Sequence, residues 1–198
     1  MHATTDTRRR ILESARDLIY ARSYSEVGVA AICERAGVKK GSFYHFFPSK
    51  VELTLAVIDE FFVEFKAQIF SEAFSPALSP LARLEKLAEL AYRFQKVVAD
   101  ETGHTLGCPF GNIAVEMSTQ DEQLRHKVAH IFSQMETNIR DTLQQAVSCG
   151  ELEPIDIEAT AKAMLAYAEG IMLMAKTRND PEVVRELMPA MVKIRIAG

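Results

Sequence analysis

The side chains best suited to contact a phosphate polymer lie close together near the N-terminus. They combine ammonium groups, hydroxyls and aromatic rings, and they are Lys39, Lys40, Ser42, Tyr44 and His45. A lysine is a point-charge partner for a phosphate or a guanine, and hydroxyl groups donate to phosphate oxygens. Gly41 stands among them without a side chain, which would let a helix backbone approach a groove closely. The set favours recognition of duplex nucleic acid over an ordinary solvated face.

Further cations flank this set on both sides. Arg8, Arg9 and Arg10 stand early in a predicted helix, where positive charges oppose the helix dipole, so phosphate is a candidate partner for them. For Arg9 and Arg10 a solvated arm is an equally good interpretation. Lys50 would open a later helix and join its free amides in a phosphate clamp.

Cys108 lies in the segment GCPFGN, at the mouth of a predicted short helix. A helix N-terminus lowers the pKa of a thiol, which would suit a sensor of oxidants or electrophiles. The alternative is a cysteine that packs as a small hydrophobic residue.

Glu122, His126 and His130 recur every four residues and would share one helix face. Two histidines at this spacing can bind a metal, but no HExxH motif is present. Because the apolar stripe of this helix points the other way, we expect a solvated face with no metal and no cofactor. The chain also lacks a nucleophile–base pair or phosphate loop, so we expect no catalytic residues and no enzyme.

Aromatic and methionine side chains are candidates for lining a cavity between helices. Such linings suit bulky apolar ligands and can repack around them. The candidates are Phe94, Phe110, Met117, Met135, Tyr167, Met172 and Met174.

Helical periodicity runs through almost the whole chain, and no alternating pattern predicts a strand. Gly37 and Val38 separate two short helices at about 29–36 and 39–46, which is the arrangement of a helix-turn-helix. The other predicted helices span about 5–22, 49–73, 80–100, 108–117, 120–148, 156–178 and 181–195. Ser49 is a suitable N-cap for the helix that follows it.

The N-terminal segment resembles the TetR family (TetR/AcrR-like) of bacterial transcriptional regulators over about residues 7–55. The matching residues are Thr7, Arg8, Ile11, Leu12, Ala15, Leu18, Tyr24, Val29, Ile32, Ala36, Gly37, Val38, Gly41, Ser42, Phe43, Tyr44, Phe46, Lys50, Val51, Glu52 and Leu53. The sequence departs from the family pattern at Ser23, where glycine is usual, and at Lys39, where a capping Ser or Thr is usual.

The resemblance implies an all-α protein with a helix-turn-helix DNA-binding domain at 1–48 and an effector-binding and dimerisation domain at 49–198. It implies phosphate contacts for Arg8, Tyr44, His45 and Lys50, and contacts nearer the bases for Lys40 and Ser42. Asn112 and Glu116 would lie on the helix that borders the ligand pocket in relatives. The segment around Cys108 resembles a subset of the family, some of which respond to electrophiles.

Composition agrees with a globular protein whose charge is divided unevenly along the chain. The sequence has 198 residues, 48% of them hydrophobic, and a formal net charge of −4. Residues 1–50 carry +4 and the remainder −8, which suits a basic DNA-binding head, although charge alone does not establish one. No signal peptide or membrane-length apolar run is visible, and three widely spaced cysteines fit a reducing cytoplasm.

The helix at 156–178 is apolar almost all round and rich in small residues, and 181–195 carries a further apolar stripe. We expect the same helices of a second copy to cover them in a homodimer; the alternative is a buried helix of a monomer.

Together with these observations, the resemblance implies a cytoplasmic, ligand-responsive repressor that binds a palindromic operator as a homodimer and is released by a small-molecule effector. The alternatives are an electrophile- or redox-sensing regulator acting through Cys108, and a helical binding protein without repressor activity.

Overall fold

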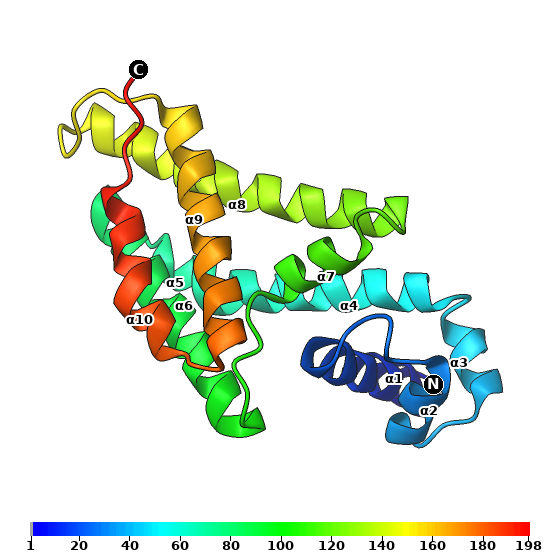
Figure 1. Ribbon diagram of the computed structural model, residues 1–198. Coiled ribbons are helices and arrows are strands. Elements are labelled where there is room, and N and C mark those ends of the chain that lie inside the picture. Colours follow the sequence, from blue (N-terminus) through cyan, green and yellow to red (C-terminus); the bar gives the residue numbers. More distant parts are fainter. Residues whose placement is uncertain (1) are drawn as a thin grey trace. The chain divides into compact units, whose positions relative to one another are not determined.

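The computed structural model describes residues 2–198, and the side chains of residues 6–198 (Figure 1). All regular elements in this range are helical, as the sequence predicted, and none of the described helices is long and apolar enough to cross a membrane. The chain forms two compact units, residues up to 63 with 109–129, and residues 64–108 with 130–198. The expected division into domains 1–48 and 49–198 stays a prediction.

The first unit is built around a small helical core. It contains α1 (His2–Ala21), α2 (Val29–Ala36), α3 (Lys40–Phe46), most of α4 (Lys50–Phe65), α7 (Pro109–Met117) and the start of α8 (Glu122–Ser148). The apolar stripe of α1 packs against buried side chains from α2, α3 and α4. The fully buried members of this core include Ile11, Leu12, Ala15, Ile32, Phe43 and Leu53. Ser49 caps α4, because its hydroxyl accepts the Glu52 N–H at 3.0 Å.

Gly37 makes the turn between α2 and α3. Its φ of 64° lies in the left-handed region, which is unfavourable for residues that carry a Cβ atom. In this conformation the Gly37 and Val38 N–H groups donate to the carbonyls of Glu34 and Cys33, at 3.1 and 2.9 Å. The bonds satisfy the end of α2 and fix the direction in which α3 leaves it.

The second unit contains the end of α4, which continues through a π-helical turn (η1, Lys66–Phe70) into α5 (Ser71–Ala73). A loop that contains Pro76 leads to α6 (Pro80–Thr102), and the remainder of α8 and α9 (Ile157–Arg178) follow. The Asp156 carboxylate caps α9 by accepting the Ala159 N–H at 2.9 Å. The helix predicted at 49–73 is therefore continuous but contains a widened turn.

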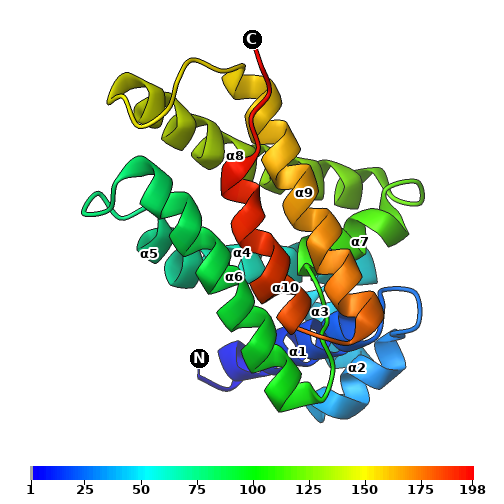
Figure 2. The same ribbon diagram turned by 60° about the vertical axis from the view of Figure 1, so that its left-hand side comes forward.

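The helix predicted at 181–195 is α10 (Glu182–Leu187) followed by a 3-10 segment (η2, Met188–Lys193). Pro189, which lacks an N–H, stands in the tighter segment. α10 lies between α6 and α9 (Figure 2). The apolar residues of α10 and η2 that are buried against the same chain include Val183, Val184, Met188 and Met191. The stripe that we expected a second copy to cover is thus already covered within the chain.

Candidate nucleic-acid interface

Helix α3 has one buried side and one exposed side. Phe43 is fully buried in the head core, and Phe47 beyond the helix is 3% exposed. The other side presents Lys39, Lys40, Gly41, Tyr44 and His45 to solvent, with Ser42 half-buried at its edge. The phenylalanines therefore anchor the helix, and the side chains predicted to contact DNA share its free face.

Packing within α3 supports the exposed aromatic residues. The Tyr44 ring stands edge-on to Phe43 with centroids 5.2 Å apart, and His45 meets Phe46 at 4.9 Å. A Cβ at Gly41 would meet nothing within 4 Å. The face therefore offers a firm platform with an open position at Gly41 where a groove wall could approach.

The three arginines of α1 have different surroundings. The Arg8 guanidinium lies over the Phe47 ring, 5.1 Å from its centroid, beside the end of α3. Arg9 pairs with Asp6 and Glu13, both at 3.5 Å, and Arg10 pairs with Asp6 at 3.4 Å. Arg8 thus contacts the residue that ends α3. Arg9 and Arg10 are engaged in ion pairs within α1, and the Arg10 guanidinium also lies near the Gly37 turn.

Lys50 is half-buried and engaged within the unit. Its Nζ donates to the Tyr24 carbonyl and lies 3.9 Å from the centre of the Tyr24 ring. Burial lowers the pKa of Lys50, and the charge of Glu116 acts in the opposite direction. A phosphate contact by Lys50 stays a prediction, but it would require the ammonium to leave these partners.

The effector-binding candidates fall in both units. In the first, α7 carries Phe110, which is buried and meets Phe62 edge-on at 6.0 Å, and half-buried Asn112. Glu116, on the same helix, is directed to the loop at 22–28, where its carboxylate accepts the Tyr24 and Ser25 N–H groups.

In the second unit, Phe94 packs near Leu90 and Ile69, and Met135 is buried. The Tyr167 hydroxyl donates to the Leu187 carbonyl at 3.1 Å. Of the other cavity candidates, Met117 is buried, Met172 is partly buried, and Met174 is 40% exposed on α9. Met174 therefore faces away from the core.

Cys108 is half-buried directly before α7, as its sequence position predicted. Burial raises the pKa of the Glu169 carboxyl, and a hydrogen bond from the Cys108 side chain only partly offsets this effect. The buried side-chain amide of Gln95 fixes the backbone just before Cys108. Its oxygen accepts the Gly107 N–H at 3.1 Å, and its nitrogen donates to the Gly107 carbonyl at 2.9 Å. Cys33 is buried and Cys149 exposed.

Glu122, His126 and His130 share an exposed side of α8. His126 Nε2 meets the Glu122 carboxylate at 2.8 Å, and His130 meets Gln134 at 2.6 Å. No group of three metal-binding side chains occurs within the part of the chain that the structure describes.

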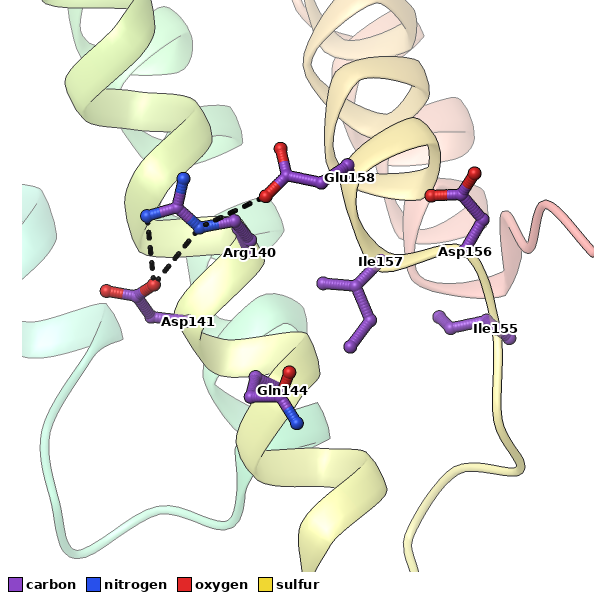
Figure 3. Close-up of a pocket in the computed structure, with 7 residues that line it drawn as sticks. All are labelled: Arg140, Asp141, Gln144, Ile155, Asp156, Ile157 and Glu158. Atoms are coloured by element: carbon purple, nitrogen blue, oxygen red, sulfur yellow. Dashed lines mark hydrogen bonds and ion pairs between the residues drawn. The ribbon is translucent and has the colours of Figure 1, made fainter. Parts of the chain in front are cut away.

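One surface hollow that the sequence did not suggest lies in the second unit, between α8 and the start of α9 (Figure 3). It measures about 470 Å³, and its lining residues are Arg140, Asp141, Gln144, Ile155, Asp156, Ile157 and Glu158. Arg140 already pairs with Asp141 at 3.3 Å and Glu158 at 3.7 Å, so the charges around the hollow mostly satisfy one another.

Two family models match different segments of the chain. Residues 11–57 match the model described as bacterial regulatory proteins, tetR family. Residues 80–191 match the model described as the tetracyclin repressor-like C-terminal domain.

Individual proteins match over nearly the whole chain. An uncharacterised HTH-type transcriptional regulator in the lacX 3' region of Lactococcus lactis is 30% identical over 181 residues, covering 90% of this chain and 88% of that protein. The HTH-type transcriptional repressor DhaR of Mycobacterium sp. is 26% identical over 94% of this chain and 90% of its own length. The crystal structure of a regulatory protein TetR from Rhodobacter sphaeroides superposes with a TM-score of 0.82 at 28% identity, covering 95% of this chain and 98% of that one.

Proposed function

We propose that this chain, which belongs to the TetR family of bacterial transcriptional regulators, represses transcription by binding a palindromic operator as a homodimer. In this proposal, binding of a small-molecule effector releases the protein from the operator. As a member of this family it is a regulator and not an enzyme. The observation that carries the proposal is the free face of α3, where exposed cations and aromatic rings stand on buried Phe43. Repression is favoured over activation because DhaR, which is similar to most of this chain, is a transcriptional repressor.

Within this proposal, a head at 1–48 reads DNA and 49–198 binds effector and dimerises. Lys40 and Ser42 contact base edges, while Arg8, Lys39, Tyr44 and His45 contact phosphates and set the register. The site of action is the cytoplasm, where the bacterial chromosome lies.

A second copy is the proposed partner of one face of α9. Ala166, Gly170, Leu173 and Met174 are exposed on this helix, and Leu173 is 59% accessible. Small residues allow another helix to approach closely, and the large apolar ones gain from being covered. We therefore assign the dimer contact to α9 rather than to α10, whose apolar residues are buried.

For the effector, we propose contacts from residues that the sequence indicated, namely Phe94, Cys108, Phe110, Asn112, Met135 and Tyr167. Their aromatic and thioether groups suit an apolar molecule, and Asn112 supplies a polar group to orient it.

A reporter assay tests repression directly. An operator is selected from genomic fragments by the full-length protein and placed between a promoter and a reporter gene. We expect expression to fall when the regulator is supplied and to stay unchanged when the operator is scrambled. Higher expression would show an activator, and no change on an operator that is bound in vitro would favour a binding protein without repressor activity.

Electrophile sensing is the second candidate, and the position of Cys108 before α7 favours it. The helix N-terminus favours the thiolate, whereas Glu169 opposes it when ionised. A sensing Cys108 should be alkylated by a small neutral electrophile faster than Cys149 and buried Cys33, and Glu169→Gln should raise its rate further. Mass spectrometry of alkylated peptides ranks the three thiols. If Cys149 reacts first, Cys108 is a packing residue. If Cys108 reacts first, the Cys108→Ser variant should remain bound to the operator under the same treatment.

A further inference from the structure

The loop that joins α1 to α2 is held by a residue distant in sequence. Glu116, in the last turn of α7, accepts the Tyr24 N–H at 2.8 Å with one carboxylate oxygen and the Ser25 N–H at 2.7 Å with the other. All three residues belong to the first compact unit. Two N–H groups thus point at one carboxylate, an arrangement that favours its ionised form.

Lys50 of α4 holds the same loop with a cation, which donates to a backbone carbonyl. Its ammonium donates to the Tyr24 carbonyl and lies over the Tyr24 ring. The Tyr24 N–H therefore donates to the carboxylate of Glu116 on α7, and the Tyr24 carbonyl accepts from the ammonium of Lys50 on α4. Each bond is charge-assisted, and such bonds are stronger than those between neutral groups.

The charges of the two clamping side chains support this arrangement. Burial raises the pKa of the Glu116 carboxyl, but the hydrogen bonds from Ser25 and Tyr24 and the charge of Lys50 outweigh burial, so its pKa lies below the ordinary value. Glu116 is therefore an anion at neutral pH, with both oxygens engaged by the protein. A carboxylate in this state is poorly placed to orient an effector.

The loop is coupled to the DNA-contacting helix by packing and by the turn at Gly37. Val27 is fully buried in the head core and Tyr24 packs against it. Val27 and Gly28 lead directly into α2, whose end fixes the start of α3 through the Gly37 turn. A displacement of the loop would therefore displace α2 and α3.

We propose that Glu116 is a positioning residue for operator binding, which fastens the α1–α2 loop to α7 so that α7 holds the recognition helix in its DNA-binding position. The inference rests on the proposed operator binding, and it replaces the effector contact that we predicted for Glu116. Movement of α7 would break or strain this clamp and lower operator affinity without any change in the residues that touch DNA.

Three variants of the full-length protein test the inference without an effector. Glu116→Ala removes both acceptors and Glu116→Gln keeps one. Glu122→Gln is the control, because it removes the same charge from an exposed carboxylate that bonds only within α8. Affinity for the fluorescein-labelled selected operator and for an unrelated duplex is measured by anisotropy, and amide exchange of residues 22–28 by mass spectrometry.

We expect Glu116→Ala to bind the operator about tenfold or more weakly, with Glu116→Gln between it and the wild type. Binding to the unrelated duplex should change little, and exchange at Tyr24 and Ser25 should accelerate. Glu122→Gln should match the wild type. Equal losses on both duplexes would mean general destabilisation and would overturn the inference, as would wild-type affinity in Glu116→Ala. If the wild type itself fails to bind any operator, it is the proposed function that fails.

Discussion

Replacing Lys40 by alanine should weaken operator binding by about tenfold to a hundredfold while changing affinity for an unrelated duplex much less. Lys40 is exposed in the first turn of α3, which buried Phe43 anchors to the core. A lysine at this place can reach a guanine edge, and loss of such a contact removes discrimination between bases. Tyr44→Phe removes only the hydroxyl that we propose contacts phosphate, and it should instead weaken binding to both duplexes by a similar factor.

Lys193→Ala is the control for Lys40→Ala. Lys193 is also exposed, but it lies in the second unit, so its loss tests the effect of one positive charge away from α3. Fluorescence titrations over a range of salt concentrations separate the two effects, because each lost phosphate contact flattens the salt dependence by roughly one unit. If Lys40→Ala and Lys193→Ala bind alike, α3 is not the recognition helix.

A negative charge at Gly170 should separate the dimer and lower operator affinity by roughly a hundredfold or more, because two linked heads bind far more tightly than one. A Cβ at Gly170 would meet nothing within 4 Å in the protomer. Gly170→Glu should therefore leave the single chain folded while placing an unpaired charge in the contact between copies.

Light scattering at micromolar concentration measures the association state, and Gly170→Ala supplies the control. Alanine is a better helix former than glycine by about 1 kcal/mol and carries no charge, so this variant should remain dimeric. Ala168 is a poorer position for the test, because it packs against the core of its own unit. A wild-type protein that is monomeric, or a dimeric Gly170→Glu, would rule out this α9 contact.

The head could be predicted because its signals are local. The stripe of α1, the Gly37 turn and the apolar spacing of α2 and α3 each span only a few residues, and the structure places their apolar residues in one core. The exposed and buried sides of α3 followed from the same spacing. These features depend on periodicity and turn chemistry, which a single sequence contains.

Features that depend on distant contacts could not be predicted in this way. Glu116 and Tyr24 are separated by 92 positions, and no periodic pattern joins them. The position of Lys50 at the start of a helix predicted a phosphate contact, yet its ammonium donates to the Tyr24 carbonyl. The apolar residues of α10 indicate burial, but only the packing of α6 and α9 shows that the same chain covers them.

The most direct test of the account is selection of duplexes from a random pool by the wild-type protein, with sequencing of those retained. Two recognition helices related by two-fold symmetry predict inverted repeats whose half-site centres lie about one helical turn, or a multiple of it, apart. Selection by Lys40→Ala should relax the preference at one symmetric pair of positions in these repeats. Retained duplexes without an inverted repeat, or no enrichment at all, would contradict a symmetric dimer that reads DNA through α3.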